Sequence, residues 1–436
     1  MTQLAPEGNR ADGRETSPLP AWPVLLLFCG MPLWWLTGLI DLVWIPVALA
    51  MALLLVSRGG VAVPRGFGLW LLFLGLLAAS FFMLPRNGGS PLVFSHRASL
   101  YLAATVLFVY VYNAPRVVRE RWVPVGLVAY WLTTVAGGFL GVLVPHGLYR
   151  TPLYYLLSKV APGALGNELL NQMAVRRFAQ GSESSYLGVE PRPSAPFLYT
   201  NNWGNVYSVL LPIVLAYLVT AKRRGPAWWV VAAIVPLSTI PAFLTVNRGM
   251  FIGLALGALI VGVRLALQRD TRALKFLGVL AVGAAIAYFV LPVQERLATR
   301  LQGASTETRA SVYQQALDLV PGSPFFGYGV PVPSEIPNEP AIGTQGHFWM
   351  LLVSHGPLAT FAFMAFFLVV ALLARGRRDP LGLTLSSGLV VAMVEMMYYG
   401  LLPYGLPILM AAAAVLAGAE RAPGPTTVPA GSPSRY

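Results

Sequence analysis

The chain has 436 residues, of which 56% are hydrophobic and only 11% charged, and its mean hydropathy is +0.65. A soluble domain usually carries about 25% charged residues. Too few charges are present here to cover a water-exposed surface, which excludes a soluble globular enzyme. The net charge of +13 comes from short basic clusters between apolar runs. Such clusters are typical of membrane topology, so no nucleic-acid partner is expected.

Both ends of the chain are polar and rich in proline. Residues 1–20 and 421–436 are therefore predicted to be disordered cytoplasmic tails. The first apolar run has no small-residue cleavage site, so no cleavable signal peptide is expected. The intervening residues, 21–420, are predicted to form one transmembrane domain. The single cysteine, Cys29, has no partner for a disulfide or for a metal site.

Apolar runs of about twenty residues mark candidate transmembrane helices, because a helix needs that length to cross the hydrocarbon core. The runs lie at about 22–39, 42–57, 66–84, 98–114, 124–145, 203–221, 227–246, 249–267, 275–292, 346–374, 381–400 and 404–419. The sequence thus predicts an all-α polytopic membrane protein with about twelve transmembrane helices.

Basic residues fall in every second connection between these runs. They are Arg58 and Arg65, then Arg116, Arg119 and Arg121, then Lys222, Arg223 and Arg224, then Arg269, Arg272 and Lys275, and finally Arg375, Arg377 and Arg378. Short basic connections stay in the cytoplasm. We therefore expect a multi-pass protein of a bacterial cytoplasmic (inner) membrane with both termini cytoplasmic.

Two long connections, about 146–202 and 293–345, fall on the opposite, extracytoplasmic side. Both have mixed charge, and each contains a stretch that predicts an amphipathic helix. Both are also partly aromatic and apolar, which favours loops that build a site over mere linkers.

An arginine at the mouth of a span gives the strongest local signal. Arg248 follows Asn247 and precedes Gly249 in the stretch LTVNRGMFIG. Charged groups at membrane depth are costly and usually face a polar cavity or a partner; the alternative is a topological anchor. The extracytoplasmic side disfavours such an anchor, so Arg248 is a candidate functional residue.

A second arginine opens the predicted helix of the second long loop. Arg309 lies in TETRASVYQQALD, and Tyr313 follows it by one helical turn. A guanidinium on such a loop suits bidentate phosphate contacts. The alternative is a surface ion pair with Glu307 or Glu295, and both interpretations stay open at this point.

Gln345 and His347 lie where the second long loop enters the next span. A histidine can serve as a general base near neutral pH, although a lone histidine is more often structural. His355, two turns later, is expected to pack or to form a hydrogen bond. Asn201 and Asn202 begin another span, where their amides could bind sugar hydroxyls or cap the helix.

Within the spans, Glu395 is a conspicuous acid. It could be the proton or ion site of a transporter, or it could pair with an arginine in the helix bundle. No nucleotide-binding, hydrolase or metal-binding motif occurs in the sequence, so neither a metal nor a cofactor is expected.

The order of these motifs resembles the O-antigen ligase and polymerase superfamily of bacterial membrane glycosyltransferases. The shared elements are the arginine at a helix start, a loop helix with Arg309, Tyr313 and Ala316, a Pro-x-x-Gly-x-Gly turn, and an aromatic-x-x-Leu-x-x-x-Gly junction. The resemblance covers about residues 196–370. It implies a GT-C-like helical fold and a metal-independent glycosyltransferase.

Such an enzyme transfers or polymerises a polyprenyl-pyrophosphate-linked glycan onto a glycan or lipid acceptor at the outer membrane face, for cell-surface polysaccharide assembly. Membrane lipid surrounds such an enzyme and is a further expected partner. By the resemblance, Arg248 and Arg309 would hold the pyrophosphate of the donor. The family's His-Asn pair falls on Gln345 and Gly346, so His347 stands two residues late and is the expected base that activates the acceptor.

Two other functional classes are compatible with the same sequence. A transporter or flippase of lipid-linked glycan predicts internal repeats, and no clear repeat is visible. A non-catalytic partner in envelope assembly would bind the carrier without turnover, and the shifted histidine keeps that alternative open.

Overall fold

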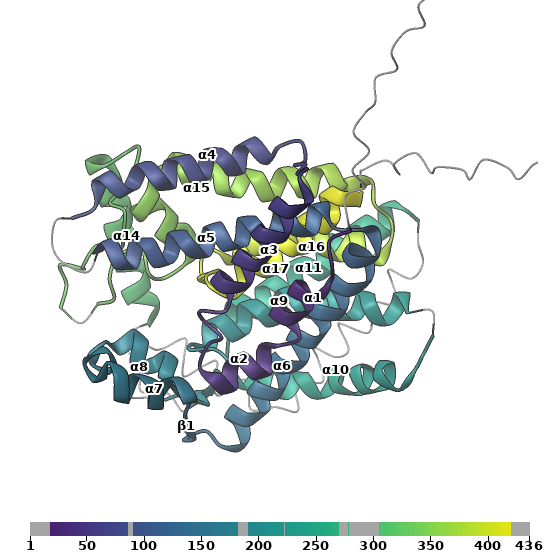
Figure 1. Ribbon diagram of the computed structural model, residues 1–436, viewed down its shortest axis with the longest axis horizontal. Coiled ribbons are helices and arrows are strands. Elements are labelled where there is room, and N and C mark those ends of the chain that lie inside the picture. The colour runs from purple at the N-terminus through teal and green to yellow at the C-terminus, as the bar shows by residue number, and fades with distance from the viewer. Residues whose placement is uncertain are drawn as a thin grey trace, which may run out of the picture.

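The computed structural model describes residues 18–85, 90–181, 191–221, 223–269, 305–337 and 339–419, together with Gly278. The described chain is mostly helical. Its helices are α1 (Trp22–Phe28), α2 (Met31–Thr37), α3 (Trp44–Arg58), α4 (Phe67–Ser80), α5 (Ser90–Asn113), α6 (Val123–Leu143), α7 (Pro152–Val160), α8 (Glu168–Ala174), α9 (Thr200–Thr220), α10 (Pro226–Leu244), α11 (Arg248–Leu267), α14 (Ser305–Leu319), α15 (His347–Leu373), α16 (Pro380–Glu395) and α17 (Gly405–Ala419). Helices α4, α5 and α15 run along the long axis of the molecule (Figure 1).

Six helices in the described ranges are long and apolar enough to cross a membrane. They are Pro91–Asn113, Val118–Leu143, Thr200–Thr220, Pro226–Leu244, Arg248–Leu267 and His347–Gly376. Four shorter apolar helices accompany them: Trp44–Arg58, Phe67–Met83, Pro380–Glu395 and Gly405–Ala419. The prediction of a polytopic helical membrane protein is confirmed. The predicted span 275–292 and nearly all of both predicted tails lie outside the described residues.

The first predicted span, 22–39, is wrong as a single helix, because the chain breaks between α1 and α2. A side chain at Gly30 would collide with the Leu26 carbonyl and the Trp34 indole. α2 then ends at Gly38, whose φ of 87° gives the left-handed conformation common at helix C-termini. Two short helices therefore replace one membrane span.

The predicted span 346–374 is also not one straight helix. Inside α15, Gly356 has φ 83° and ψ 169°, and Pro357 follows it. The rings of His347 and Phe363 lie 5.1 Å apart, whereas sixteen residues of straight helix would separate them by about 24 Å. The chain therefore folds back at Gly356. Residues 347–355, the re-entrant arm, pack against the second half of the helix.

The basic connections meet at one end of the bundle, which we call the basic end. Arg58 Nη1 donates to the carbonyl of Asn113 at 2.7 Å, and Arg119 Nη2 donates to the carbonyl of Gly418 at 3.2 Å. The guanidinium of Arg264 donates to two carbonyl groups in the connection that follows α15. Connections far apart in sequence thus share one face of the molecule.

The two long loops lie together at the opposite end, the loop end. Helix α14 lies at the upper left of Figure 1, and α7, α8 and β1 lie at its lower left. The first long loop also contains two small antiparallel sheets, which corrects the all-α prediction. Strand β1 (Leu148–Arg150) pairs with β2 (Val175–Arg177), and β3 (Ala179–Gln180) pairs with β4 (Arg192–Pro193).

A buried ion pair fastens the first long loop to the helix bundle. Arg176 on β2 contacts Asp41, which lies between α2 and α3, with 2.5 Å between Nη2 and Oδ2 and side chains only 1% exposed. The Tyr404 hydroxyl donates to the other oxygen of Asp41. Burial alone would lower the pKa of Arg176, but the Asp41 carboxylate outweighs it and raises that pKa, so Arg176 stays charged.

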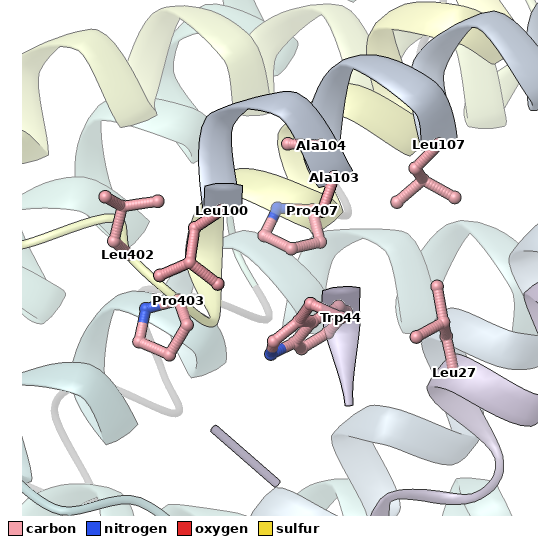
Figure 2. Close-up of a pocket in the computed structure, with 9 residues that line it drawn as sticks. All are labelled: Leu27, Trp44, Leu100, Ala103, Ala104, Leu107, Leu402, Pro403 and Pro407. Carbon is pink, nitrogen blue, oxygen red and sulfur yellow. The ribbon is translucent and has the colours of Figure 1, made fainter. Parts of the chain in front are cut away.

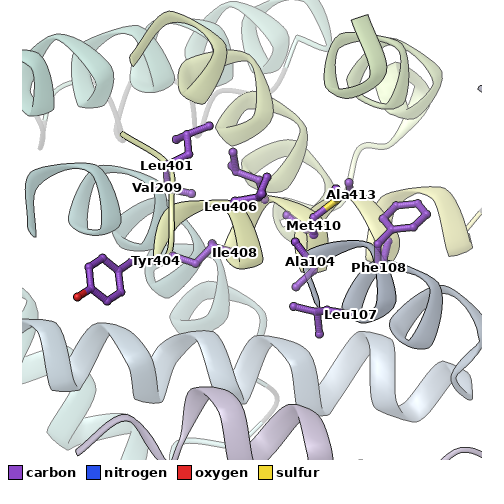
Figure 3. Packing of buried hydrophobic residues seen from close by; sticks show 14 of the residues in the cluster. Ala104, Leu107, Phe108, Val209, Leu401, Tyr404, Leu406, Ile408, Met410 and Ala413 are labelled. Atoms are coloured by element: carbon purple, nitrogen blue, oxygen red, sulfur yellow. The ribbon is translucent and has the colours of Figure 1, made fainter. Parts of the chain in front are cut away.

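Helix α17 occupies the centre of the bundle, and nearly all its side chains are buried. Figure 3 shows Leu406 and Met410 of α17 beside Ala104 and Leu107 of α5. The run of four alanines at 411–414 lets neighbouring helices approach closely, as small residues do between membrane helices. Because α17 is buried, the short connection that precedes it is also held inside the bundle.

Replacing Arg176 by glutamine should leave the Asp41 carboxylate buried without its cation. We expect the free energy of unfolding to fall by about 3–5 kcal/mol. The adjacent Arg177 is exposed, so Arg177→Gln, which removes the same charge, should change it by less than about 0.5 kcal/mol. Thermal unfolding of the purified protein in detergent measures both variants. Equal stability of the two would show that the ion pair does not anchor the loop.

Candidate functional site

Arg248 is the first residue of α11, at the loop end of the bundle. Its side chain is partly exposed. The preceding Asn247 is buried, and its Nδ2 donates to the carbonyl of Thr200 at 2.7 Å. This bond ties the start of α11 to the start of α9. The positive end of the α11 dipole and the guanidinium of Arg248 together favour an anion at this position.

The turn into α11 is conformationally unusual. Val246 has φ 49°, a left-handed value that is rare for a β-branched residue and that persists only where surrounding contacts impose it. Val246 is buried, as are its neighbours Thr245 and Asn247. Packing therefore fixes the backbone that leads into Arg248.

Asn201 and Asn202 lie in the first turn of α9, where both are partly exposed. The N-cap position of this helix is occupied by Tyr199, and no side chain caps it. Helix capping therefore does not account for the two amides. The bond from Asn247 to Thr200 places them beside the start of α11.

Glu395 ends α16 and joins three helices inside the bundle. Its Oε2 accepts hydrogen bonds from Asn205 Nδ2 at 2.9 Å and Ser208 Oγ at 2.8 Å, both on α9. On the other side, Gly253 of α11 packs so closely on Oε1 that an added Cβ would collide with it. Within the described residues, the hydrogen-bond donors to Glu395 are therefore neutral, and no arginine pairs with it there.

The chain leaves helical conformation after Glu395, and residues 396–401 form what we call the hub segment. The re-entrant arm bonds to it directly: His347 N donates to Tyr399 O at 2.8 Å, and Phe348 N donates to Met396 O at 2.9 Å. A Cβ on Gly249 would lie 2.8 Å from the Tyr399 hydroxyl. The hub segment therefore touches both the arm and the start of α11.

The loop helix α14 reaches the same segment through Tyr313. Its hydroxyl donates to the carbonyl oxygens of Gln345 and Met397 at 3.1 and 3.2 Å. Its ring stacks on Trp349, with centroids 4.3 Å apart. The Trp349 indole also donates to Met397 O. Tyr313 and Met397, which are 84 positions apart in the sequence, are thus in direct contact.

Arg309 lies one turn before Tyr313 on α14 and is partly exposed. Burial raises the pKa of Tyr313, and the charge of Arg309 opposes that shift. At this helical spacing, Arg309 lies on the same face of α14 as Tyr313, the face that meets the hub segment. The side chain of Gln345 is also partly exposed nearby.

His347 is fully buried. The amide of Leu401 donates to Nδ1 at 3.4 Å, and Nε2 lies 3.2 Å from the Tyr101 hydroxyl. Since Nδ1 accepts, the neutral ring carries its proton on Nε2 and donates it to Tyr101. Both ring nitrogens are therefore engaged, and the general-base role of His347 stays a prediction. The expectation for His355 is confirmed: it lies 2.7 Å from Ser80 Oγ.

Sequence reasoning missed two charged residues that the structure places inside the bundle. Asp41 interrupts the apolar stretch GLIDLVW, and Arg97 interrupts a run that becomes α5. A single charge within an apolar run is itself a signal of function or pairing in membranes. Applied to these two positions, that rule would have found both.

An apolar pocket lies between α5 and the start of α17. Figure 2 shows its nine lining residues, namely Leu27, Trp44, Leu100, Ala103, Ala104, Leu107, Leu402, Pro403 and Pro407. None of them is titratable, so this pocket cannot supply acid–base chemistry. In the described ranges of the chain, no three His, Cys, Asp or Glu side chains are grouped to hold a metal ion.

The structure is that of a polytopic helical membrane protein in which the start of α11, the loop helix α14 and the start of α15 all approach one unwound segment. Residues 233–349 match the family model described as Wzy_C: O-Antigen ligase. Residues 233–349 of this polytopic membrane protein are thus similar to the O-antigen ligase family, as the sequence motifs indicate. The matched range includes Arg248, Arg309 and His347 but ends before the hub segment. No curated protein matches the chain.

Substitution of Gly253 by alanine should force Glu395 away from its place between α9 and α11. We expect the free energy of unfolding to fall by about 1–3 kcal/mol, as for other overpacked sites. At Gly257, one turn further along the same face, a Cβ would lie 3.4 Å from Val391, which is ordinary contact. Gly257→Ala should therefore be neutral or stabilising. Thermal unfolding compares the two, and equal effects would mean that Glu395 is not tightly held.

The raised pKa of Tyr313 makes the docking of α14 sensitive to alkaline pH. Stability from a neutral phenol is fully present below about pH 10 and is lost as pH rises through the folded-state pKa. Hydrogen exchange in α14 should therefore accelerate above about pH 10 in the wild type. Tyr313→Phe, which loses about 1 kcal/mol of hydrogen bonding, should lack that alkaline step. The same step in both proteins would exclude Tyr313 as its source.

Proposed function

We propose that this chain transfers or polymerises a glycan carried on polyprenyl pyrophosphate onto a glycan or lipid acceptor, for cell-surface polysaccharide assembly. One observation carries the proposal. The family-matched stretch supplies the start of α11, the loop helix α14 and the start of α15, and all three contact the hub segment. Segments spread over 100 positions thereby approach one another, which supports a shared site.

The distribution of basic residues indicates how the protein is oriented in the membrane. Short basic connections remain in the cytoplasm, so the basic end of the bundle faces the cytoplasm and both termini lie there. The loop end then faces outward. In that orientation the partly exposed Arg248 and Arg309 meet a donor whose glycan is displayed at the outer face of the cytoplasmic membrane.

The reaction breaks the bond between the anomeric carbon and the pyrophosphate oxygen. The acceptor hydroxyl attacks the anomeric carbon, its proton passes to a base, and the carrier pyrophosphate leaves with the bonding electron pair. Arg248 and Arg309 stabilise the charge that develops on the leaving pyrophosphate, and the α11 dipole adds to them. Guanidinium forks suit the paired oxygens of phosphate groups.

His347 is the proposed base, acting through Nδ1. Its contact with the Leu401 amide is long, at 3.4 Å, so a small shift of the hub segment releases the Nδ1 lone pair. The bond from Nε2 to Tyr101 keeps the tautomer that leaves Nδ1 basic. The amides of Asn201, Asn202 and Gln345 would bind sugar hydroxyls, because each offers both a donor and an acceptor.

Purified protein, incubated with a polyprenyl-pyrophosphate oligosaccharide and a panel of glycan and lipid acceptors, should release carrier and form a transferred or lengthened glycan. Arg248→Ala and Arg309→Ala should each lower the rate by about 10²–10³, the usual loss when a group that stabilises developing charge is removed. Arg65→Ala removes an exposed charge at the basic end and should leave the rate unchanged.

The same assay tests the base. If His347 acts through Nδ1, His347→Ala should lower the rate and abolish the acidic limb of the pH–rate profile. An unaltered profile at a lowered rate would make His347 a residue that only holds the hub segment. Carrier binding without turnover of any acceptor would refute the transferase. Movement of carrier across a vesicle membrane would instead identify a flippase.

A further inference from the structure

One face of α5 packs against both histidines of the bent helix α15. The ring of Phe94 lies 6.1 Å from that of His355, and the ring of Tyr101 lies 6.4 Å from it. Tyr101 also lies 5.9 Å from the ring of His347. Arg97 stands between Phe94 and Tyr101 at helical spacing, three residues after one and four before the other. Its side chain therefore points toward the same two rings.

The guanidinium of Arg97 has no counter-charge in the parts of the chain that are described. The rings of Tyr101, His347 and His355 pack together on this face of α5, and none of them carries a negative charge. The Nη1 of Arg97 is buried and forms no hydrogen bond. Arg97 as a whole is partly exposed, but a guanidinium nitrogen that is buried without a hydrogen-bond acceptor is unfavourable, and more so at membrane depth. Such a group is expected to bind an anion.

His355 offers a complementary unpartnered atom. The Ser80 hydroxyl donates its hydrogen to the Leu77 carbonyl at 2.7 Å, so it accepts the bond from His355 Nδ1 at 2.7 Å. The Nε2 of His355 is then a lone pair, buried and without a partner. A phosphate monoester suits both groups, since its oxygens accept from the guanidinium and its hydroxyl donates to Nε2.

Depth and surroundings point to a lipid-borne phosphate. Arg97 lies sixteen residues from Asn113, and Arg248 lies sixteen from Arg264, both anchored at the basic end. At 1.5 Å per residue, both arginines stand about 24 Å from that end. Leu100, Ala104 and Leu107 follow Arg97 at helical spacing on the same side of α5, so an apolar chain attached to the phosphate would meet apolar side chains along this helix.

We propose that Arg97 and His355 form a second anion subsite, separate from Arg248 and Arg309, which binds the phosphate monoester of a membrane lipid. The phosphate lies between α5 and the re-entrant arm, and the lipid chain follows α5. The subsite is tested by ligand binding alone, so the result of that test does not depend on glycan transfer.

Binding is measured on the full-length protein in detergent, with farnesyl phosphate as the probe and farnesol as the phosphate-free control. The Arg248→Ala/Arg309→Ala background removes the proposed donor site. In that background, Arg97→Gln should weaken farnesyl phosphate binding by about 10- to 100-fold, the loss of charge-assisted hydrogen bonds. His355→Asn keeps a donor to Ser80 but lacks Nε2, and should also weaken binding. Arg65→Gln, the matched charge control, should not.

Farnesyl phosphate binding that survives Arg97→Gln, or farnesol binding as tight as that of the phosphate, would overturn the proposal. Competition by phosphatidic acid as strong as by farnesyl phosphate assigns the subsite to a phospholipid headgroup; weaker competition assigns it to an isoprenoid carrier. Thermal unfolding without ligand is a second test. Arg97→Gln should be at least as stable as the wild type, because it removes an uncompensated charge. A loss comparable with that of Arg176→Gln would identify a structural ion pair and contradict the subsite.

Discussion

Backbone groups that leave helical conformation inside a membrane must find hydrogen-bond partners within the protein, because lipid offers none. The hub segment meets this requirement through residues brought from elsewhere in the chain. The amides of His347 and Phe348 donate to its carbonyl oxygens, and so do the side chains of Tyr313 and Trp349. The same bonds that satisfy the backbone therefore hold the loop helix and the re-entrant arm in place. The site is a consequence of that requirement.

Charge is distributed unequally through the bundle, and the distribution separates structural from functional arginines. Arg176 is paired with Asp41 and fixes a loop. Arg58 and Arg119 bind backbone carbonyls at the basic end. Arg97, by contrast, faces only neutral groups within the described chain. In the subsite proposed above, a lipid phosphate supplies the charge that this cation lacks, and the unliganded protein is the less stable for it.

The bend in α15 changes where its two histidines lie. As a straight span, it would place His347 and His355 on one face of a single helix. The bend at Gly356 instead turns the arm back, so that His355 meets Ser80 at the end of α4 while His347 lies against Phe363. Such a bend is invisible to hydropathy, since both halves are equally apolar. A glycine followed by a proline marks a possible break, but not its direction.

The sequence by itself determined that this is a polytopic helical membrane protein, that basic connections alternate along it, and that its second half resembles the O-antigen ligases. Those properties depend on composition and on local order, which hydropathy and motifs record directly. Only the tertiary structure decided that Glu395 is held by Asn205 and Ser208, that the first long loop is fastened by Asp41, and that the face of α5 with Phe94 and Tyr101 packs on His355. Each depends on which helices become neighbours, and that is settled by close packing and by the pairing of buried polar groups across long stretches of chain.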